Sequence, residues 1–215
     1  MKIQVLISKK SWSQNYKKII LKKLKKFTNK LIFLTNHKYL KNNYDINIIF
    51  SYFKKIPSKY LKRSKYNLVP HESNLPKGKG MSPLTWQILE RKKKVTFSLI
   101  EANNKIDSGI IYFKKKVIIP KTFIFKEIKK TQLYTNLLLI TKFINFLNTN
   151  KRPPKKLISK LKESFYKKRK PKDSEININK KLKDQFNLLR VVDNENYPAY
   201  FKIYGKKFYL RIEKK

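Results

Sequence analysis

The side chains that could carry out chemistry are concentrated in residues 69–113. This stretch contains His71, one of only two histidines, and three of the four glycines of the chain, Gly78, Gly80 and Gly109. A histidine side chain titrates near neutral pH and can therefore move protons. Glycine normally makes up about 7% of a protein, so the few that remain here mark backbone that tolerates no other residue. We therefore look for the functional site in this stretch.

The sequence carries no other recognisable pattern of catalytic or metal-binding residues. It has no cysteine, which excludes disulfides, thiolate metal ligands and a cysteine nucleophile. The two histidines stand 34 positions apart and do not indicate a metal centre. Neither a Gly-x-Gly-x-x-Gly nor a Gly-Lys-Ser/Thr segment is present, so no dinucleotide or nucleoside triphosphate site is indicated. We expect no metal ion.

The charge of the chain is extreme, with 54 Lys and Arg against 13 Asp and Glu and a formal net charge of +41. Such a charge is typical of proteins that bind nucleic acid. However, only six of the basic residues are Arg, and the lysines are spread along the entire length. Nucleic-acid-binding surfaces concentrate their charge on one face and use Arg for fork-like contacts. We therefore expect a solvated lysine-rich surface and no specific nucleic-acid partner.

Short apolar runs and one lysine-coated run alternate along the first half of the chain. The expected strands are residues 3–7, 31–34, 45–50, 67–69, 95–100 and 109–113, and the expected helices are residues 17–26 and 82–90. Ser82 and Pro83 are residue types favoured at a helix N-cap and first position. This alternation predicts an α/β fold with a mostly parallel sheet.

The expected elements place His71 and Asp107 in two different loops. His71 follows the strand at residues 67–69, and Asp107 comes 36 positions later, after the strand at residues 95–100. Open α/β sheets bind their ligands beyond the carboxyl ends of the strands. We expect the two loops to bring His71 and Asp107 together at that edge. His37 is assigned a structural role.

Three segments of this region together resemble the folate-dependent formyltransferase family. They read HESNLP (71–76), SPLTWQILE (82–90) and IDSGIIY (106–112), with a glycine-containing turn between the first two. The similarity covers residues 45–120. It implies a Rossmann-like formyltransferase sheet and transfer of a formyl group from N10-formyltetrahydrofolate, the co-substrate, to a primary amine.

The resemblance implies catalytic roles for His71 and Asp107. His71 matches the family histidine, which stabilises the oxyanion or moves a proton, and Asp107 matches the aspartate that orients it. The family asparagine two residues before the histidine is replaced by Val69, so we expect Ser73 and Asn74 to supply hydrogen bonds in its place. The expected co-substrate contacts are made by Gly80, Lys79, Ala102 and Gly109. Lys79 is alternatively part of a solvated face, and Trp86 is expected in the core.

The C-terminal part resembles amino-sugar N-formyltransferases of surface-glycan biosynthesis, including pseudaminic-acid-type pathways. The similar segments read ESFYKKRKPKDSEININ (163–179) and QFNLLRVVDNENYPAYFKIYGKKFYLRI (185–212), the latter with a β-hairpin around Gly205. Arg169 and Arg190 are expected either to bind the substrate or to form structural salt bridges. The implied acceptor is a nucleotide-linked amino sugar, because about 40 residues after position 172 are too few for the β-barrel of a methionyl-tRNA formyltransferase. That enzyme and an inactive basic nucleic-acid-binding protein remain the alternatives.

The chain divides into three expected parts. Residues 1–148 form the catalytic domain, residues 149–172 a linker or peripheral segment rich in Lys and Pro, and residues 173–215 a small C-terminal segment. The apolar run at residues 3–7 is too short for a signal peptide, and Lys142 interrupts the run at residues 137–147. We expect a cytoplasmic protein without a membrane span, and a homodimer is compatible with the sequence.

Overall fold

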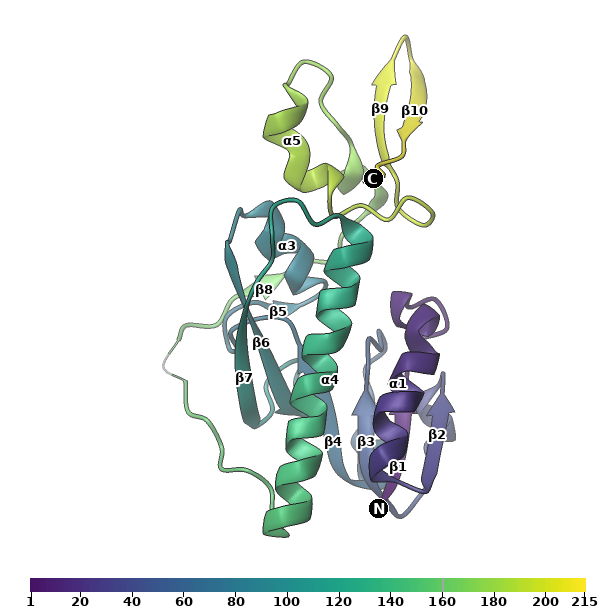
Figure 1. Cartoon of the computed structure of the whole chain (residues 1–215), viewed down its shortest axis with the longest axis vertical. Coiled ribbons are helices and arrows are strands. Elements are labelled where there is room, and N and C mark those ends of the chain that lie inside the picture. The colour runs from purple at the N-terminus through teal and green to yellow at the C-terminus, as the bar shows by residue number, and fades with distance from the viewer. Residues whose placement is uncertain (160) are drawn as a thin grey trace.

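A six-stranded sheet forms the centre of the molecule (Figure 1). The computed structural model describes residues 1–159 and 161–215. The strands run in the order β2 (Lys30–Leu34), β1 (Lys2–Leu6), β3 (Tyr44–Ile49), β4 (Ser64–His71), β6 (Lys94–Glu101) and β7 (Ile111–Ile118). The first four pair in parallel, and β6 and β7 add to β4 as antiparallel strands. The expected α/β fold with a mostly parallel sheet is confirmed.

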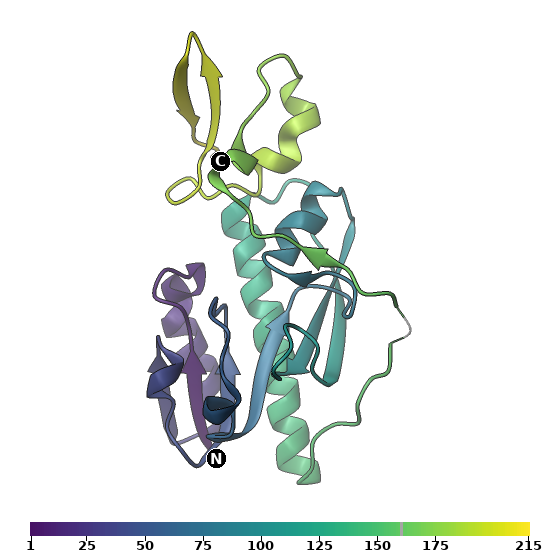
Figure 2. The same ribbon diagram turned by 180° about the vertical axis from the view of Figure 1, so that it is seen from behind.

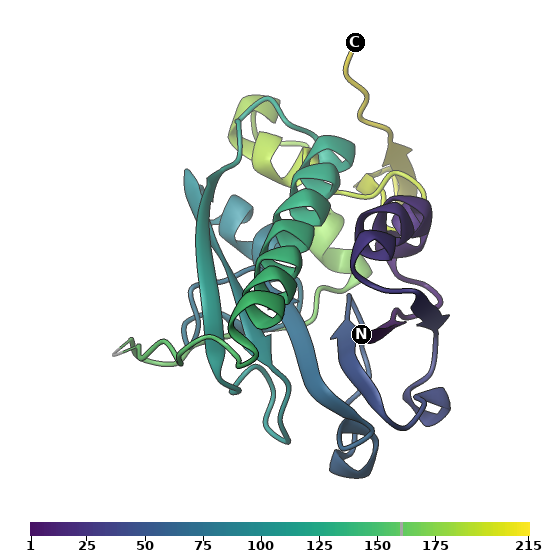
Figure 3. The same ribbon diagram turned by 60° about the horizontal axis from the view of Figure 1, so that its bottom comes forward.

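Two helices cover one face of this sheet. Helices α1 (Lys17–Leu24) and α4 (Phe125–Asn150) lie in front of the strands in Figure 1, and Figure 3 shows both from the lower end. Apolar residues at three- and four-residue spacing give α4 one buried stripe. This stripe includes Leu133, Leu137, Ile140 and Ile144. It packs on Phe97 and Leu99 of β6 in the main hydrophobic core, which fixes α4 across the sheet.

The remaining helical turns of this region are short. They are η1 (Trp12–Tyr16), η2 (Lys25–Phe27), η3 (His37–Tyr39), α2 (Ser58–Leu61) and α3 (Pro83–Leu89). A second buried cluster joins Leu6, Leu40, Ile49, Ile56 and Leu61, and it anchors the loop after β3. That loop forms one wall of the site described below.

After α4 the chain reaches the outer edge of the sheet, where Leu157 pairs with Ile111 at the start of β7. Figure 2 shows from behind how the chain after residue 160 continues toward the C-terminal residues. Residues 163–166, which we call the strap, then reach the glycine-containing loop that follows β4. Strand β8 (Phe165–Tyr166) pairs in parallel with β5 (Lys79–Gly80). The segment expected as a linker therefore contributes a strand that contacts the region of the site.

The C-terminal residues form a small unit with its own buried cluster. It contains η4 (Pro171–Ser174), α5 (Leu182–Leu189), β9 (Ala199–Ile203) and β10 (Lys206–Leu210). Ile176, Leu189, Val192 and Ala199 are buried together at its centre. Strands β9 and β10 form an antiparallel hairpin that turns at Tyr204 and Gly205, so the expected β-hairpin is confirmed.

Some local expectations were wrong. Ser82 does not cap α3 through its side chain, because its backbone is left-handed with φ of 52°, whereas a capping serine is normally extended. The last expected strand, residues 109–113, begins at Ile111 and extends to Ile118. In the part of the chain that the structure describes, no helix has the length and apolar character needed to cross a bilayer.

Candidate active site

A cavity of about 340 Å³ opens at the carboxyl ends of β3 and β4. This is the edge of an open α/β sheet where ligands normally bind. The lining comes from four places: the loop after β3 (Ser51–Ile56), the end of β4 (Val69–Glu72), residues Gly80–Pro83, and the end of β6 with its loop (Ile100–Ser108). Trp12 and the side chains of Lys129 and Gln132 on α4 close it from the helical face.

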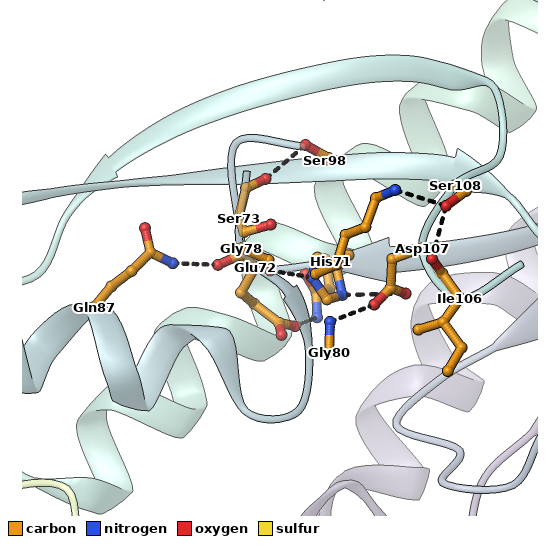
Figure 4. Close-up of polar contacts among 12 residues, drawn as sticks. His71, Glu72, Ser73, Gly78, Gly80, Gln87, Ser98, Ile106, Asp107 and Ser108 are labelled. Carbon is orange, nitrogen blue, oxygen red and sulfur yellow. Dashed lines mark hydrogen bonds and ion pairs between the residues drawn. The ribbon is translucent and has the colours of Figure 1, made fainter. Parts of the chain in front are cut away.

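His71 and Asp107 meet in this cavity, as expected from their loops. The Nδ1 of His71 lies 3.5 Å from Oδ1 of Asp107, and the His71 Nε2 donates a hydrogen bond of 2.9 Å to the carbonyl oxygen of Gly78 (Figure 4). His71 is only 6% exposed. A backbone carbonyl therefore occupies Nε2, and Nδ1 is the ring nitrogen that faces the carboxylate.

The glycine loop, residues 78–80, makes hydrogen bonds to both His71 and Asp107. The backbone N–H of Gly80 donates to Oδ2 of Asp107 at 2.8 Å, while the carbonyl of Gly78 accepts from His71. Asp107 has a left-handed backbone with φ of 48°, a conformation that Asp and Asn tolerate better than most residues. The loop backbone therefore fixes the carboxylate and the imidazole relative to each other.

The strap in turn fixes the glycine loop. The backbone N–H groups of Gly78 and Lys79 donate to the carbonyl of Ser164 at 3.0 and 2.8 Å, and that of Met81 donates to the carbonyl of Tyr166 at 3.0 Å. A Cβ added to Gly80 would lie 2.4 Å from the Tyr166 carbonyl oxygen, which is closer than real contacts allow. Glycine is required here because the strap backbone approaches so closely.

A half-buried acidic residue, Glu101, also lines the cavity. Its two oxygens accept hydrogen bonds from the backbone N–H of Asn67 at 2.6 Å and the hydroxyl of Tyr112 at 3.0 Å. Burial raises the pKa of Glu101 to about 7, although these hydrogen bonds oppose the shift. The cavity therefore contains a carboxyl group that changes charge near neutral pH.

This raised pKa predicts that stability falls as the pH rises from about 4.5 to about 7. The folded protein holds the Glu101 proton more tightly than the unfolded chain does, so removing the proton favours unfolding. Glu101→Gln is expected to weaken this dependence, because the amide still accepts from the Asn67 N–H. Thermal melting of both proteins across this range measures the effect. Identical pH dependence in the two proteins would contradict the prediction.

The structure brings only some of the expected co-substrate residues to the cavity. Gly80 and Ala102 line it. Lys79 is 2% exposed, and its Nζ donates to Ser108 Oγ at 2.7 Å and to Glu163 at 2.5 Å. It is therefore neither a cavity residue nor part of a solvated face. At Gly109 a Cβ would lie 1.6 Å from the Glu101 carbonyl oxygen, so its glycine is explained by close backbone packing.

The residues expected to replace the family asparagine do not point to the cavity. Ser73 is buried beside Gly78, and its carbonyl accepts from Ser98 Oγ at 2.7 Å. The Asn74 side chain accepts from Lys114 Nζ at 2.7 Å. Both lie past the point where the chain turns away from β4, so neither reaches the His71 ring. Val69 lines the cavity with an apolar side chain.

Arg169 and Arg190 have structural contacts instead of the expected position at the cavity. Arg190 is 2% exposed, and its Nη1 donates to the carbonyl of Lys121 at 2.6 Å. Arg169 donates to the carbonyl of Asp173 at 2.6 Å. Neither partner is a carboxylate, so the alternative of side-chain salt bridges was also wrong for these contacts. Arg190 instead joins the C-terminal unit to the turn between β7 and α4, and Arg169 contacts η4.

Trp86 and His37 both contact aromatic side chains in the structure. Trp86 is half-buried; it stacks on Tyr166 with ring centroids 6.3 Å apart and donates to the Lys167 carbonyl, so it packs against the strap segment and not in the core. His37 contacts the Tyr52 hydroxyl at 2.8 Å and the Tyr60 ring, in agreement with a structural role.

Sequence reasoning missed several residues of the cavity. Glu72, directly after His71, lines it with a buried side chain, and Lys129 and Gln132 reach it from α4. Glu72 stood inside the segment HESNLP and could have been considered for its type and position. Lys129 could not be distinguished from the other lysines of the chain, because no neighbouring residue indicates that its side chain is buried.

No protein-family model matches the chain, but individual relatives do. It is 30% identical over 170 residues to the bifunctional polymyxin resistance protein ArnA of Wigglesworthia glossinidia brevipalpis, covering 74% of this chain and 25% of that protein. It is 43% identical over 76 residues to a methionyl-tRNA formyltransferase of Buchnera aphidicola, covering 35% and 24%. The chain thus spans about a quarter of the length of these curated relatives.

Solved structures share the fold over nearly the whole chain. A methionyl-tRNA formyltransferase from Clostridium thermocellum superimposes with a TM-score of 0.77 at 23% identity, over 99% of this chain and 92% of that one. A sugar N-formyltransferase from Shewanella gives a TM-score of 0.69 at 17% identity, over 100% and 98%. HypX from Aquifex aeolicus, in complex with tetrahydrofolic acid, gives 0.73 at 16% identity, over 99% and 37%.

The chain belongs to the formyltransferase family. The family expected from the segments around His71, Trp86 and Asp107 is therefore confirmed. The cavity lies where those segments meet at the edge of the sheet, and it combines an imidazole, a carboxylate and a glycine loop.

Proposed function

We propose that this formyltransferase transfers a formyl group from N10-formyltetrahydrofolate to the primary amine of a nucleotide-linked amino sugar. The observation that carries the proposal is the meeting of His71 and Asp107 in a cavity at the carboxyl edge of the sheet. Membership of the formyltransferase family supports the reaction type. The similarity to a sugar N-formyltransferase over almost the full length of both chains supports the acceptor class.

The apolar part of the cavity lining is suited to the ring system of the co-substrate. The inner wall of the cavity includes Ile56, Leu61 and Ile100, and two large apolar side chains at its rim, Phe53 and Ile106, are 52% and 63% exposed. Exposed apolar side chains around a hollow are typical of ligand sites. The bound folate would supply the formyl group. No step in the proposal requires a metal ion.

In this proposal His71 moves a proton between the attacking and the leaving nitrogen through Nδ1, because the Gly78 carbonyl holds the proton on Nε2. Asp107 stabilises the positively charged ring through Nδ1, and Gly78 orients it through Nε2. A charged imidazole beside the formyl oxygen would also stabilise the negative charge that develops there. Because the ring is almost fully buried, bulk water would not compete for this proton.

The test is a transfer assay with purified protein. Incubation with N10-formyltetrahydrofolate and a panel of nucleotide-linked amino sugars is expected to release tetrahydrofolate and to give an N-formylated sugar detected by mass spectrometry. The same sugars with a hydroxyl in place of the amine are the negative control. Folate release without a formylated product, or no release with any acceptor, would contradict the proposal.

Methionyl-tRNA is the second candidate acceptor, favoured by the 43% identity to a methionyl-tRNA formyltransferase and by the net charge of +41. Aminoacylated initiator tRNA therefore belongs in the same assay. Transfer requires remote contacts that hold the acceptor amine at attack distance. We expect this protein to make such contacts with an amino sugar, so kcat/KM should be higher for the sugar than for the tRNA. Faster formylation of the tRNA would select the second candidate.

A further inference from the structure

Glu72 directly follows His71, and both residues line the cavity. Glu72 is 8% exposed, and Oε1 accepts a hydrogen bond of 2.8 Å from Nδ2 of Asn136, which is itself buried on α4. The backbone carbonyl of Glu72 accepts from Gln87 Nε2 at 2.6 Å, which Figure 4 shows together with His71. Contacts to α3 and α4 therefore set the position of this carboxylate.

The partner of Glu72 is neutral, which is unusual for a buried carboxylate. Among the residues that the structure describes, the salt bridges involve other acidic groups, and Glu72 is in none of them. A buried carboxylate that lacks a direct ion pair is costly, and a cation that enters the cavity would reduce this cost. Asn136 donates to Oε1, and for the described residues no hydrogen bond to Oε2 is found, so Oε2 can accept from such a cation.

The charged groups around Glu72 come from three elements. His71 precedes it on β4, Asp107 lies on the loop after β6, and Lys129 reaches the cavity from α4. Burial lowers the pKa of Lys129 to about 8, and attraction to Glu72 opposes this shift. The Lys129 Nζ donates to Gln132 at 2.9 Å and lies 4.9 Å from the centre of the Trp12 ring. Lys129 is therefore held by other groups of the helical wall.

We propose that Glu72 binds the ammonium group of the acceptor and removes its proton before formyl transfer. This role rests on the proposed function and adds a residue to it. An aliphatic amine is mostly protonated at neutral pH, and only the neutral form is a nucleophile. A carboxylate one residue from His71 is placed to bind the cation and to receive the proton.

The proton and bond changes balance in three steps. The acceptor ammonium gives one proton to the Glu72 carboxylate, which leaves a neutral amine and a carboxylic acid. The amine nitrogen then forms a bond to the formyl carbon, and the bond between that carbon and N10 of the folate breaks. The second proton of the amine passes through His71 to N10, and Glu72 returns its proton to solvent. The products are the formamide, tetrahydrofolate and one released proton.

The test is the pH profile of kcat/KM for Glu72→Gln. At pH 7 the variant is expected to lose about a hundredfold, the low end for general acid–base groups. The loss should shrink to a few-fold above the pKa of the free acceptor amine, because the amine then arrives neutral. A purely structural role predicts a loss that does not recover. Glu72→Asp, which keeps the carboxylate, should retain more activity than Glu72→Gln at pH 7.

Two controls make the profile interpretable. Glu195→Gln makes the same change on an exposed residue outside the cavity and should leave the profile unchanged. Glu101→Gln identifies any part of the profile that belongs to Glu101, whose pKa is about 7.

Calorimetry gives a readout that is independent of turnover. The wild-type protein is expected to bind an amino-sugar nucleotide more tightly than the same nucleotide with a hydroxyl, and Glu72→Gln should lose this preference. Transfer by the wild type with an unchanged profile in Glu72→Gln would overturn the role of Glu72 alone. Absence of transfer to any amine by the wild type would overturn the proposed function, and this role with it.

Discussion

Replacing Asp107 by asparagine is expected to lower kcat/KM at least about a hundredfold. Asparagine tolerates the left-handed backbone at this position and still offers an oxygen to the Gly80 N–H, so the fold should survive. What the variant lacks is the negative charge beside the His71 Nδ1. His71→Asn should lose at least as much, since it removes the proton-carrying ring itself.

Steady-state kinetics with formylated folate and an accepted amine measures both effects. Asp184→Asn, the same change on an exposed position of α5, serves as the control and should leave kcat/KM near the wild-type value. Asp107→Asn with wild-type turnover and an intact fold would show that Asp107 is a turn residue without a part in catalysis.

Gly80→Ala is expected to damage both the stability and the activity of the site. The backbone at Gly80 has φ of 96°, and the new Cβ would lie 2.4 Å from the Tyr166 carbonyl oxygen. To make room, the strap must move away from the loop, and the hydrogen bond from the Gly80 N–H to Asp107 is lost or weakened. We expect about 3 kcal/mol of lost stability or more, in the range of severe steric changes, together with a large drop in kcat.

Gly205→Ala is the matched control for this prediction. Gly205 also has a positive φ, of 70°, but nothing lies within 4 Å of the added Cβ. Its cost should be limited to the backbone strain of about 1–2 kcal/mol for a left-handed alanine, with kcat unchanged. Urea denaturation and kinetics on both variants separate strain from steric conflict. Equal effects in the two variants would mean that the strap does not constrain the loop.

The sheet and the meeting of His71 and Asp107 could be predicted, because local sequence patterns indicate both. Apolar runs marked β1, β3 and β6. The sequence order of His71 at the end of one strand and Asp107 in the loop after β6 was enough to expect that they meet. The contacts of Lys79, Arg190 and the strap could not be predicted. These contacts join residues that are far apart in the sequence. Neither the types of these residues nor their sequence neighbours indicate which residues pair. The expected side-chain cap at Ser82 was wrong, because the left-handed backbone of Ser82 outweighed the usual preference of serine for capping a helix.

The strap also has a consequence for the order in which the site is assembled. The hydrogen bond between the Gly78 N–H and the side chain of Ser164 joins positions 86 apart in the sequence. Contacts of such separation form late, because a long loop must close before they contribute. During synthesis the sheet strands and α4 emerge well before residue 163, so they can fold while the glycine loop is still unsupported. The chain would therefore acquire its fold first, and the geometry around His71 only when the strap arrives.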